Sequence, residues 1–308
     1  MAKVVVTGGA GFIGSHIVDS LLASGHSIEV IDDLSSGNTE NLPAGVTLHK
    51  LDIRSADTRA LLAKIQPDIL VHAAAQISVR VSMENPVFDT EVNVVGLVNL
   101  LHAFAGRRYP HFVLLSTGGA IYGDQDVFPA PENHPIRASS VYGTAKRVDE
   151  MYLDLWGRQY GMSWTALRLA NVYGPRQNPH GEAGVVAIFA QRLLRKQQPT
   201  INGDGTQTRD FVFVGDVAAA VKAVTDKSVT GIYNIGTGRE TNVNQLYSMI
   251  RGAVGSQTEA THAEAKAGEQ MRSCIDAALA SKTFGWKPSM PIEQGIKATV
   301  EWFRQHAA

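Results

Sequence analysis

The sequence has almost no cysteine: among its 308 residues, Cys274 is the only one. A single thiol excludes an intramolecular disulfide and the zinc sites that are built from several cysteines. The ten histidines include no His-x-x-x-His pair, so we predict no metal site. The single cysteine and the strand-like start MAKVVVTGG lead us to expect a protein of the reducing cytoplasm.

Long apolar runs and an excess of charge are also missing. The longest apolar stretches are short strand-like pieces such as 3–6 and 112–115, far below the roughly 18 residues of a membrane-spanning helix. Lys and Arg number 28 against 29 Asp and Glu, a formal net charge of -1. We therefore expect no membrane and no nucleic-acid partner, and an anionic ligand would have to be held by local groups.

Short β-branched segments alternate with helical patterns along the first half of the chain. Strand-like segments lie at 4–7, 28–32, 47–52, 68–75, 111–117 and 164–170, and helical ones at 12–24, 56–65, 85–106 and 141–160. This alternation is typical of crossovers above and below a parallel sheet. We predict an α/β fold, a Rossmann-like doubly wound parallel sheet with a smaller α/β substrate-binding lobe at the C-terminal side.

Glycines follow the first predicted strand. Residues 9–14, Gly-Ala-Gly-Phe-Ile-Gly, satisfy the dinucleotide-binding fingerprint. Gly8, Gly11 and Gly14 form a second set of glycines, spaced three residues apart. Glycine permits the tight turn and the close approach of a pyrophosphate, whose charge is favoured at a helix N-terminus. An ordinary glycine-rich turn is the alternative. We predict cofactor contacts at Gly8, Gly11, Phe12, Ile13 and Gly14.

An acidic residue, Asp32, ends the second predicted strand. At this place a carboxylate can accept both ribose hydroxyls of an adenosine and would repel a 2′-phosphate, so NAD is predicted rather than NADP. Asp33 is predicted to lie beside it, and Asp52 and Ile53 after the next strand are predicted to flank the adenine. The alternative for Asp32 and Asp33 is a turn or a cap before Leu-Ser-Ser-Gly-Asn.

The regular alternation of strands and helices ends at Asn171, where a turn-rich loop precedes a helical segment at 184–197. Residues 231–236 are predicted to form another strand of the sheet. The two lobes are therefore expected to interleave along the chain. We assign 1–170, and also 211–237, to an NAD-binding Rossmann domain, and 171–210 with 238–308 to the substrate-binding lobe.

Tyr142 and Lys146 are four residues apart, so on a helix both side chains point the same way. A free phenol titrates near a pKa of about 10, and the ammonium together with a positive nicotinamide ring would have to lower it. The pair is then a candidate acid/base. The alternative is a coincidence, since this spacing occurs in many helices.

Taken together, these residues resemble the extended short-chain dehydrogenase/reductases. The resemblance spans nearly the whole chain and rests on residues 8–14, Asp32, His72-Ala-Ala-Ala75, Asn93, Ser116-Thr117, Tyr142 with Lys146, and Leu167-Arg-Leu-Ala-Asn171. It implies NAD as the cofactor and a homodimer. It also implies cofactor contacts from Ala73, Ala74, Ala75, Asn93, Tyr142 and Lys146.

Within that family, residues 115–123 and 203–217 look most like bacterial UDP-glucose 4-epimerases. Sugar-nucleotide dehydratases of the family carry acidic residues where this chain has Gly118 and Gly119, and glycine cannot move a proton. The resemblance thus implies interconversion of UDP-glucose and UDP-galactose through a 4-keto intermediate, with UDP-N-acetylhexosamines as further candidates. The alternatives are another sugar-nucleotide enzyme (reductase, decarboxylase or dehydratase) and a non-catalytic NAD-binding regulator.

Many epimerases carry a catalytic serine at the position of Gly118, so another residue of this chain has to supply that hydroxyl. We favour Thr117 over Ser116 as its replacement in catalysis and in contact with the sugar, beside Tyr142. The alternative for Thr117 is a strand-end hydroxyl that bonds only the backbone.

The resemblance also implies contacts with the UDP part of a UDP-hexose. The expected substrate contacts are Asn171, Val185, Arg209, Glu269, Arg272 and Ser273. Arg209 suits phosphate because its planar fork matches two oxygens, while a solvated pair with Asp210 is the alternative. Lys266-Ala-Gly-Glu269 departs from the family's Arg-x-Gly-Asp, for which Arg272 would compensate. Ser273 stands where the family limits the size of the sugar.

Overall fold

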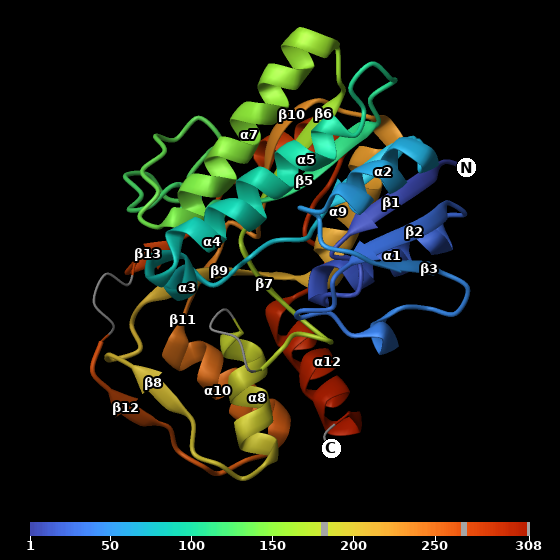
Figure 1. Ribbon diagram of the computed structural model, residues 1–308. Helices are drawn as coiled ribbons and strands as arrows, with labels where there is room; N and C mark the ends of the chain where they lie inside the picture. Colours follow the sequence, from blue (N-terminus) through green and yellow to red (C-terminus); the bar gives the residue numbers. More distant parts are fainter. Residues whose placement is uncertain (180–183, 266–269, 307–308) are drawn as a thin grey trace.

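The computed structural model describes residues 1–179, 184–265 and 270–306, and its largest element is a parallel seven-stranded sheet (Figure 1). The strand order is β10-β6-β5-β4-β1-β2-β3. The strands are β1 (Lys3–Thr7), β2 (Ser27–Asp32), β3 (Thr47–Lys50), β4 (Ile69–His72), β5 (His111–Thr117), β6 (Trp164–Leu169) and β10 (Gly231–Ile235). The order reverses between β1 and β4, where the carboxyl ends of parallel strands leave a crevice for ligands. The predicted Rossmann-like fold is confirmed.

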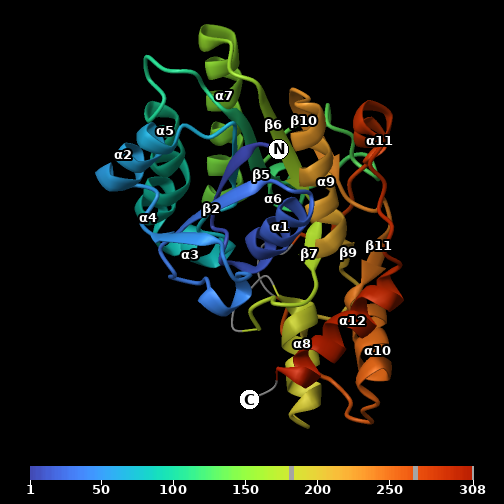
Figure 2. The ribbon, with the colours of Figure 1, turned by 90° about the vertical axis from the view of Figure 1, so that its right-hand side faces the viewer.

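Helices cover both faces of this sheet, as Figure 2 shows. One face carries α1 (Phe12–Ala23), α9 (Val214–Lys227) and α11 (Ala278–Phe284), and the other carries α2 (Ala56–Ile65), α5 (Gly96–His102) and α7 (Val141–Tyr160). A strand that is buried on both faces has no polar side, and β4 and β5 accordingly read as continuous apolar runs. The core therefore lies in two layers, one on each side of the sheet.

The long helix that the pattern predicts over 85–106 is broken into three pieces. They are α4 (Pro86–Thr90), a π-helical turn η2 (Glu91–Val95) and α5, preceded by an unexpected short helix α3 (Val79–Glu84). Asn85 caps α4 by accepting from the N–H of Phe88. The π turn rotates Asn93 inward, where its amide is fully buried against the loop after β4.

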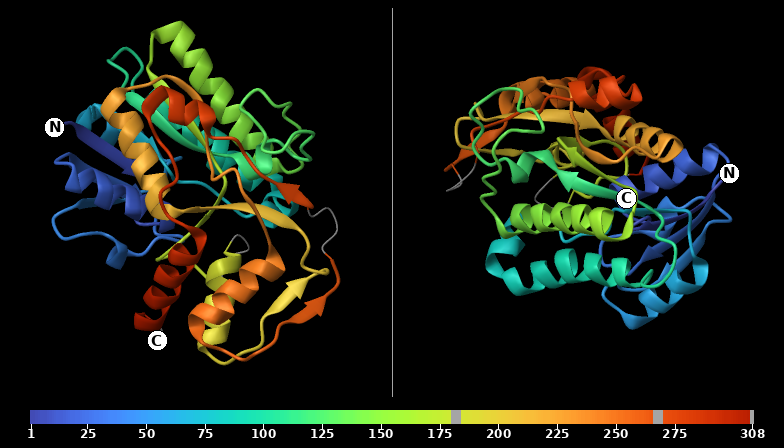
Figure 3. Two further views of the ribbon diagram at one scale, coloured as in Figure 1. Left: turned by 180° about the vertical axis from the view of Figure 1, so that it is seen from behind. Right: turned by 90° about the horizontal axis from the view of Figure 1, so that it is seen from above.

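The smaller lobe is built around three packed helices below the sheet, at the lower end of Figure 1. They are α8 (Val185–Leu194), α10 (Val243–Val254) and α12 (Ile292–Gln305), and Figure 3 shows the red C-terminal helix beside the other two. Small sheets join β7 (Asn171–Tyr173), β9 (Thr208–Phe213), β11 (Glu240–Asn242) and β13 (Arg272–Ser273), and separately β8 (Thr200–Asn202) and β12 (Thr261–Ala263). Short turns η1 (Thr39–Asn41) and α6 (Gly118–Ile121) complete the elements.

Buried carboxylates tie the two lobes together. Asp210 in β9 accepts from the backbone N–H and the hydroxyl of Thr237, directly after β10. Asp216 in α9 accepts from the N–H of Ser289 and Met290, before α12. Burial raises the pKa of Asp210, and the hydrogen bonds act against that rise. The chain thus passes between the lobes several times. Over the three described ranges, no helix is long and apolar enough to cross a membrane.

Candidate active site

The glycine turn between β1 and α1 is held so tightly that side chains would not fit. Gly8 has a φ of +69°, and a Cβ there would lie 2.5 Å from the backbone nitrogen of Ala74. A Cβ on Gly14 would overlap the carbonyl oxygen of Gly8. Gly8 therefore meets both a backbone conformation and a close approach that favour glycine.

The first turn of α1 presents free donors. Gly11 is its N-cap and offers no side-chain acceptor. The backbone N–H groups of Phe12, Ile13 and Gly14 have no protein acceptor among the described residues. Unpaired N–H groups at the positive end of a 12-residue helix form a place where a phosphate is stabilised.

Asp32 supports this turn from the next strand. Its Oδ2 accepts from the N–H of Ala10 at 2.9 Å, and its Oδ1 accepts from the N–H of Leu34 at 2.9 Å. Burial raises the pKa of Asp32, against the effect of these two bonds. A carboxylate has about four acceptor positions, so two remain for hydroxyl groups of a ligand. The cap that we weighed as an alternative is thus present without excluding a role in binding.

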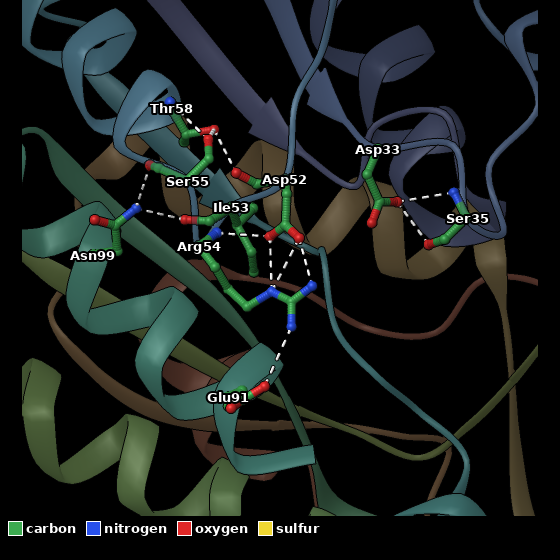
Figure 4. A network of polar contacts seen from close by, with 9 residues as sticks. All are labelled: Asp33, Ser35, Asp52, Ile53, Arg54, Ser55, Thr58, Glu91 and Asn99. Carbon is green, nitrogen blue, oxygen red and sulfur yellow. Dashed lines mark hydrogen bonds and ion pairs between the residues drawn. The ribbon is translucent and has the colours of Figure 1, made fainter. Parts of the chain in front are cut away.

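Asp33 and Asp52 lie at the outer edge of this region and are already engaged (Figure 4). Asp33 accepts from the N–H and the hydroxyl of Ser35, which is the turn we considered. Asp52 forms an ion pair with Arg54 at 2.5 Å, and the guanidinium also reaches Glu91 at 3.6 Å. The hydrogen bond from Arg54 lowers the pKa of Asp52, with burial acting in the opposite direction.

Ile53 is packed against α5. A Cβ on Gly96 would lie 2.6 Å from its Cδ1, so that glycine leaves room for it. The Asn99 amide donates to the carbonyls of Ile53 and Ser55 at 2.7 and 2.9 Å (Figure 4). The segment expected beside an adenine is therefore fixed to the body of the domain.

The loop after β4 runs past the glycine turn and holds Ala73, Ala74 and Ala75. Asn93 braces it: its Oδ1 accepts from the N–H of Gln76, and its Nδ2 donates to the carbonyl of Gln76 and to Asp89. Asn93, expected to contact the cofactor, thus holds the loop that borders the crevice.

Tyr142 and Lys146 lie on the first two turns of α7, which Ser140 caps by accepting from the N–H of Gly143. The Tyr142 ring is half-buried, and its hydroxyl has no hydrogen-bond partner within the described part of the chain. Burial raises the pKa of Tyr142, and the charges of Asp149 and Asp89 add to the rise. The Lys146 ammonium is buried, 3.4 Å from Oδ2 of Asp149.

A close packing contact sets the start of α7 against the end of β5. A Cβ on Gly143 would lie 2.5 Å from the carbonyl oxygen of Ala120 in α6. The hydroxyl of Thr117 caps this same short turn by accepting from the N–H of Ala120 at 3.2 Å. Thr117 therefore lies at the turn that adjoins Tyr142, and its alternative role as a backbone cap is also present.

Three predicted substrate residues converge on Gly119. A Cβ built there would lie 3.7 Å from Oδ1 of Asn171, 4.0 Å from Oγ of Ser273 and 4.0 Å from Oγ1 of Thr117. These side chains come from β7, β13 and the end of β5. Far apart in sequence, they meet around Gly119 near the carboxyl end of β5.

Ser116 faces away from that position. Its hydroxyl donates to Glu150 at 2.8 Å, and Glu150 forms a buried ion pair with Arg168 at 2.7 Å. A hydroxyl held in this network is not available to a ligand. Of the two hydroxyls, Thr117 is the one that lies beside Gly119, and its role in catalysis stays a prediction.

The substrate residues predicted in the smaller lobe differ in their positions and partners. Arg272 is paired with Glu240 at 2.6 Å and lies over the ring of Phe128 at 3.7 Å. Arg209 donates to the carbonyl of Thr208 and pairs with Ser273 across β9 and β13. Val185 begins α8. Glu269 lies outside the described residues.

Comparison with known proteins agrees with this geometry. Residues 4–236 match the NAD dependent epimerase/dehydratase family. The chain belongs to this family. It is 43% identical over 308 residues to a UDP-glucose 4-epimerase of Mycolicibacterium smegmatis, which covers 98% of both chains.

Solved structures of other members of the family superpose closely on this chain. The UDP-glucose 4-epimerase of Thermotoga maritima, determined with UDP-glucose, has a TM-score of 0.96 at 41% identity and covers 99% of this chain and 100% of its own. The enzyme of Thermus thermophilus, determined with NAD, has a TM-score of 0.93 at 43% identity, covering 98% and 99%. The resemblance inferred from the sequence is confirmed.

The residues of this family member fit NAD. The glycine turn forms a cradle that a Cβ at Gly8 or Gly14 would fill, and the N–H groups at the start of α1 are unpaired toward it. Asp32 keeps acceptor positions for ribose hydroxyls. These groups would hold the two phosphates and the adenosine ribose, in agreement with the prediction of NAD.

Sequence reasoning missed the polar residues behind Tyr142 and Lys146. Asp149 and Asp89 are fully buried there, and His72 accompanies them with its Nδ1 2.7 Å from the hydroxyl of Thr7. Asp149 could have been noticed, because a carboxylate three residues after a helical lysine lies on the same face. Asp89 could not, because it comes from a different helix.

Proposed function

We propose that this protein is an NAD-dependent UDP-glucose 4-epimerase, which interconverts the 4-epimers of UDP-hexoses through a 4-keto intermediate. The observation that carries the proposal is the meeting of Thr117, Asn171 and Ser273 around Gly119, at the turn packed against the start of α7. Gly118 and Gly119 offer no acidic side chain at the positions where the elimination chemistry of a dehydratase needs one.

Tyr142 is the proposed acid/base. Its unpaired hydroxyl would take the proton from the 4-hydroxyl of the sugar and later return it. Lys146, one helical turn further, would favour the phenolate, since a nearby positive charge lowers the pKa of a phenol. Thr117 would hydrogen-bond the oxygen on carbon 4. NAD, when bound, supplies the acceptor for the hydride of carbon 4 and returns it in the same cycle.

The smaller lobe is proposed to hold the nucleotide while the sugar turns. Return of the hydride to the opposite face requires firm contacts to UDP and loose ones to the hexose. Asn171, Val185, Arg209, Glu269 and Arg272 are the proposed UDP contacts. Ser273 and Gly119 present little side-chain volume, which supports N-acetylated sugars as further substrates.

The test is a set of separate incubations of the purified protein with UDP-galactose, UDP-glucose and UDP-N-acetylglucosamine, without added NAD. Chromatographic resolution of 4-epimers in each mixture is the expected result, and it would also reveal the substrate range. If no epimer forms even after NAD is added, the proposal fails. Net consumption of NADH or release of carbon dioxide would instead indicate a reductase or a decarboxylase.

We also propose a cytoplasmic homodimer with two functional lobes. Large apolar side chains are exposed on α4, η2 and α7, which pack side by side: Val87 (67% exposed), Val95 (50%) and Met151 (55%). Apolar residues gathered on neighbouring helices support a protein contact at this face. The lobes are proposed to be 1–170 with 211–237, and 171–210 with 238–308, although β9 spans the boundary at 211 and pairs with strands of the small sheet.

A further inference from the structure

Lys146 is surrounded by buried polar atoms that the proposed reaction does not use. Its ammonium is 3.4 Å from Oδ2 of Asp149, and the two side chains are only 2% and 0% exposed. Oδ1 of Asp149, Oδ1 of Asp89 and Nε2 of His72 are buried without a hydrogen-bond partner in the described ranges. A buried polar atom without a partner is destabilising, so three around one ammonium require an explanation.

The carboxyl groups around Lys146 oppose the ionisation that an acid/base tyrosine needs. Burial lowers the pKa of His72 well below its usual value, with a further contribution from the Lys146 ammonium, and the ring is neutral. Glu150 is paired with Arg168 and also with Arg147. The ammonium of Lys146 therefore faces two carboxyl groups, Asp149 in direct contact and Asp89 further away.

We propose that Asp149 is a positioning residue, which holds the Lys146 ammonium, offsets part of its charge, and thereby sets how readily the Tyr142 hydroxyl loses its proton. This inference rests on the proposed function only in taking Tyr142 as the acid/base. A cation favours the phenolate, and a carboxylate held against that cation weakens its effect. The carboxylate of Asp149 thus keeps Tyr142 a stronger base than Lys146 alone would allow.

The charge of Asp149 itself changes near neutrality. Burial raises the pKa of Asp149 to about 7, while the charge and the hydrogen bond of Lys146 act against the rise. Once Asp149 is protonated, Lys146 is uncompensated and Tyr142 ionises more easily. Asp149 is ionised over the range in which Tyr142 titrates, because burial raises the pKa of Tyr142 above its usual value, so the full carboxylate charge acts on the tyrosine there.

The other charged groups of the elements packed against α7 do not replace Asp149 in this role. On α3, Arg80 and Glu84 are exposed and paired with each other, and Glu91 on η2 reaches toward Arg54. The groups that face the cluster are Asp89 from α4, His72 from β4, Arg168 from β6, and Lys146, Tyr142 and Glu150 from α7 itself.

The test is an absorbance titration of tyrosinate in the holoprotein without substrate, with the Tyr142→Phe protein subtracted so that only Tyr142 is seen. Asp149→Asn keeps an oxygen for Lys146 and removes the charge. We expect the Tyr142 midpoint to fall by about half a unit to one unit. Asp154→Asn, which removes an exposed carboxylate from the same helix, should leave the midpoint unchanged.

An unchanged midpoint in Asp149→Asn would overturn the inference. Asp149→Thr provides a second neutral variant, with melting temperature and NAD content measured for both. Loss of folding in both variants would make Asp149 purely structural and would also overturn it. The titration needs no turnover, so a shifted midpoint in a protein that epimerises no UDP-hexose would separate this inference from the proposed function. If both hold, the acid limb of kcat/KM moves by the same amount.

Discussion

Gly118 lies directly against Ile275: a Cβ on the glycine would be 2.8 Å from Cδ1 of the isoleucine. The adjacent Gly119 instead faces Thr117, Asn171 and Ser273, and a Cβ there would meet them at ordinary contact distances. Packing thus explains Gly118, whereas Gly119 borders residues of the proposed site.

Alanine at each of these glycines should separate stability from activity. Gly118→Ala should lower the free energy of unfolding by about 1–3 kcal/mol, because the methyl group overpacks Ile275. Gly119→Ala should leave stability almost unchanged but reduce kcat/KM about 10-fold or more, because its methyl occupies space of the sugar. Urea unfolding and epimerase assays measure both effects. The reverse pattern would place the site elsewhere.

Removal of the Tyr142 hydroxyl should abolish most catalysis without loosening the fold. Tyr142→Phe should reduce kcat by about 100- to 10,000-fold, the usual contribution of general acid/base catalysis. The hydroxyl has no partner among the described residues, so the melting temperature should not fall. Kinetics and thermal unfolding check this, with NAD content as the control for cofactor binding. Activity within tenfold of the wild type would exclude Tyr142 as the acid/base.

Loss of one partner from the buried ion pair behind β5 should be severe. Arg168→Met leaves the buried Glu150 with only the partly exposed Arg147, 3.2 Å away, which should lower the free energy of unfolding by about 3 kcal/mol. The matched control is Arg158→Met, which breaks an exposed pair with Asp154 and should cost less than about 1 kcal/mol. Denaturant unfolding of both proteins measures the difference, and equal losses would contradict the argument.

His111 should make stability depend on pH between its two pKa values. Burial lowers the pKa of His111 to about 4 in the folded state, against about 6.5 when unfolded. Between these values the unfolded chain binds more protons, so stability is fully present above pH 6.5 and is lost as the pH falls toward 4. The expected loss is about 3 kcal/mol at most. His111→Asn should flatten this part of the curve, and an unchanged slope would contradict it.

A charge on the exposed face of α7 should dissociate the proposed dimer. Leu155→Glu should give monomers by light scattering, because a carboxylate would be buried in the apolar contact. Leu22→Glu on α1, where leucine is similarly exposed at 37%, is the control and should not change the mass. A monomeric wild-type protein would rule out the dimer itself.

Features that depend on near neighbours in the chain could be read from the sequence. The glycine turn follows from backbone sterics within residues 8–14, and the bounds of α7 follow from the cap at Ser140 and the left-handed Gly161. Strands β4 and β5 were recognisable because burial on both faces gives each an unbroken apolar run, 69–71 and 112–115. The broken helix after Asn85 was not recognisable, because the inward turn of Asn93 is set by a loop from another strand.

The sequence alone determined the fold class, the nucleotide turn and the spacing of Tyr142 and Lys146, since each of these is fixed by local periodicity or by a short motif. Only the tertiary structure decided that Ser116 bonds Glu150 while Thr117 lies beside Gly119, and that Gly118 meets Ile275. Only it placed Asp149 against the buried ammonium. The physical reason is that burial and charge pairing depend on residues far along the chain, which only the folded protein brings together.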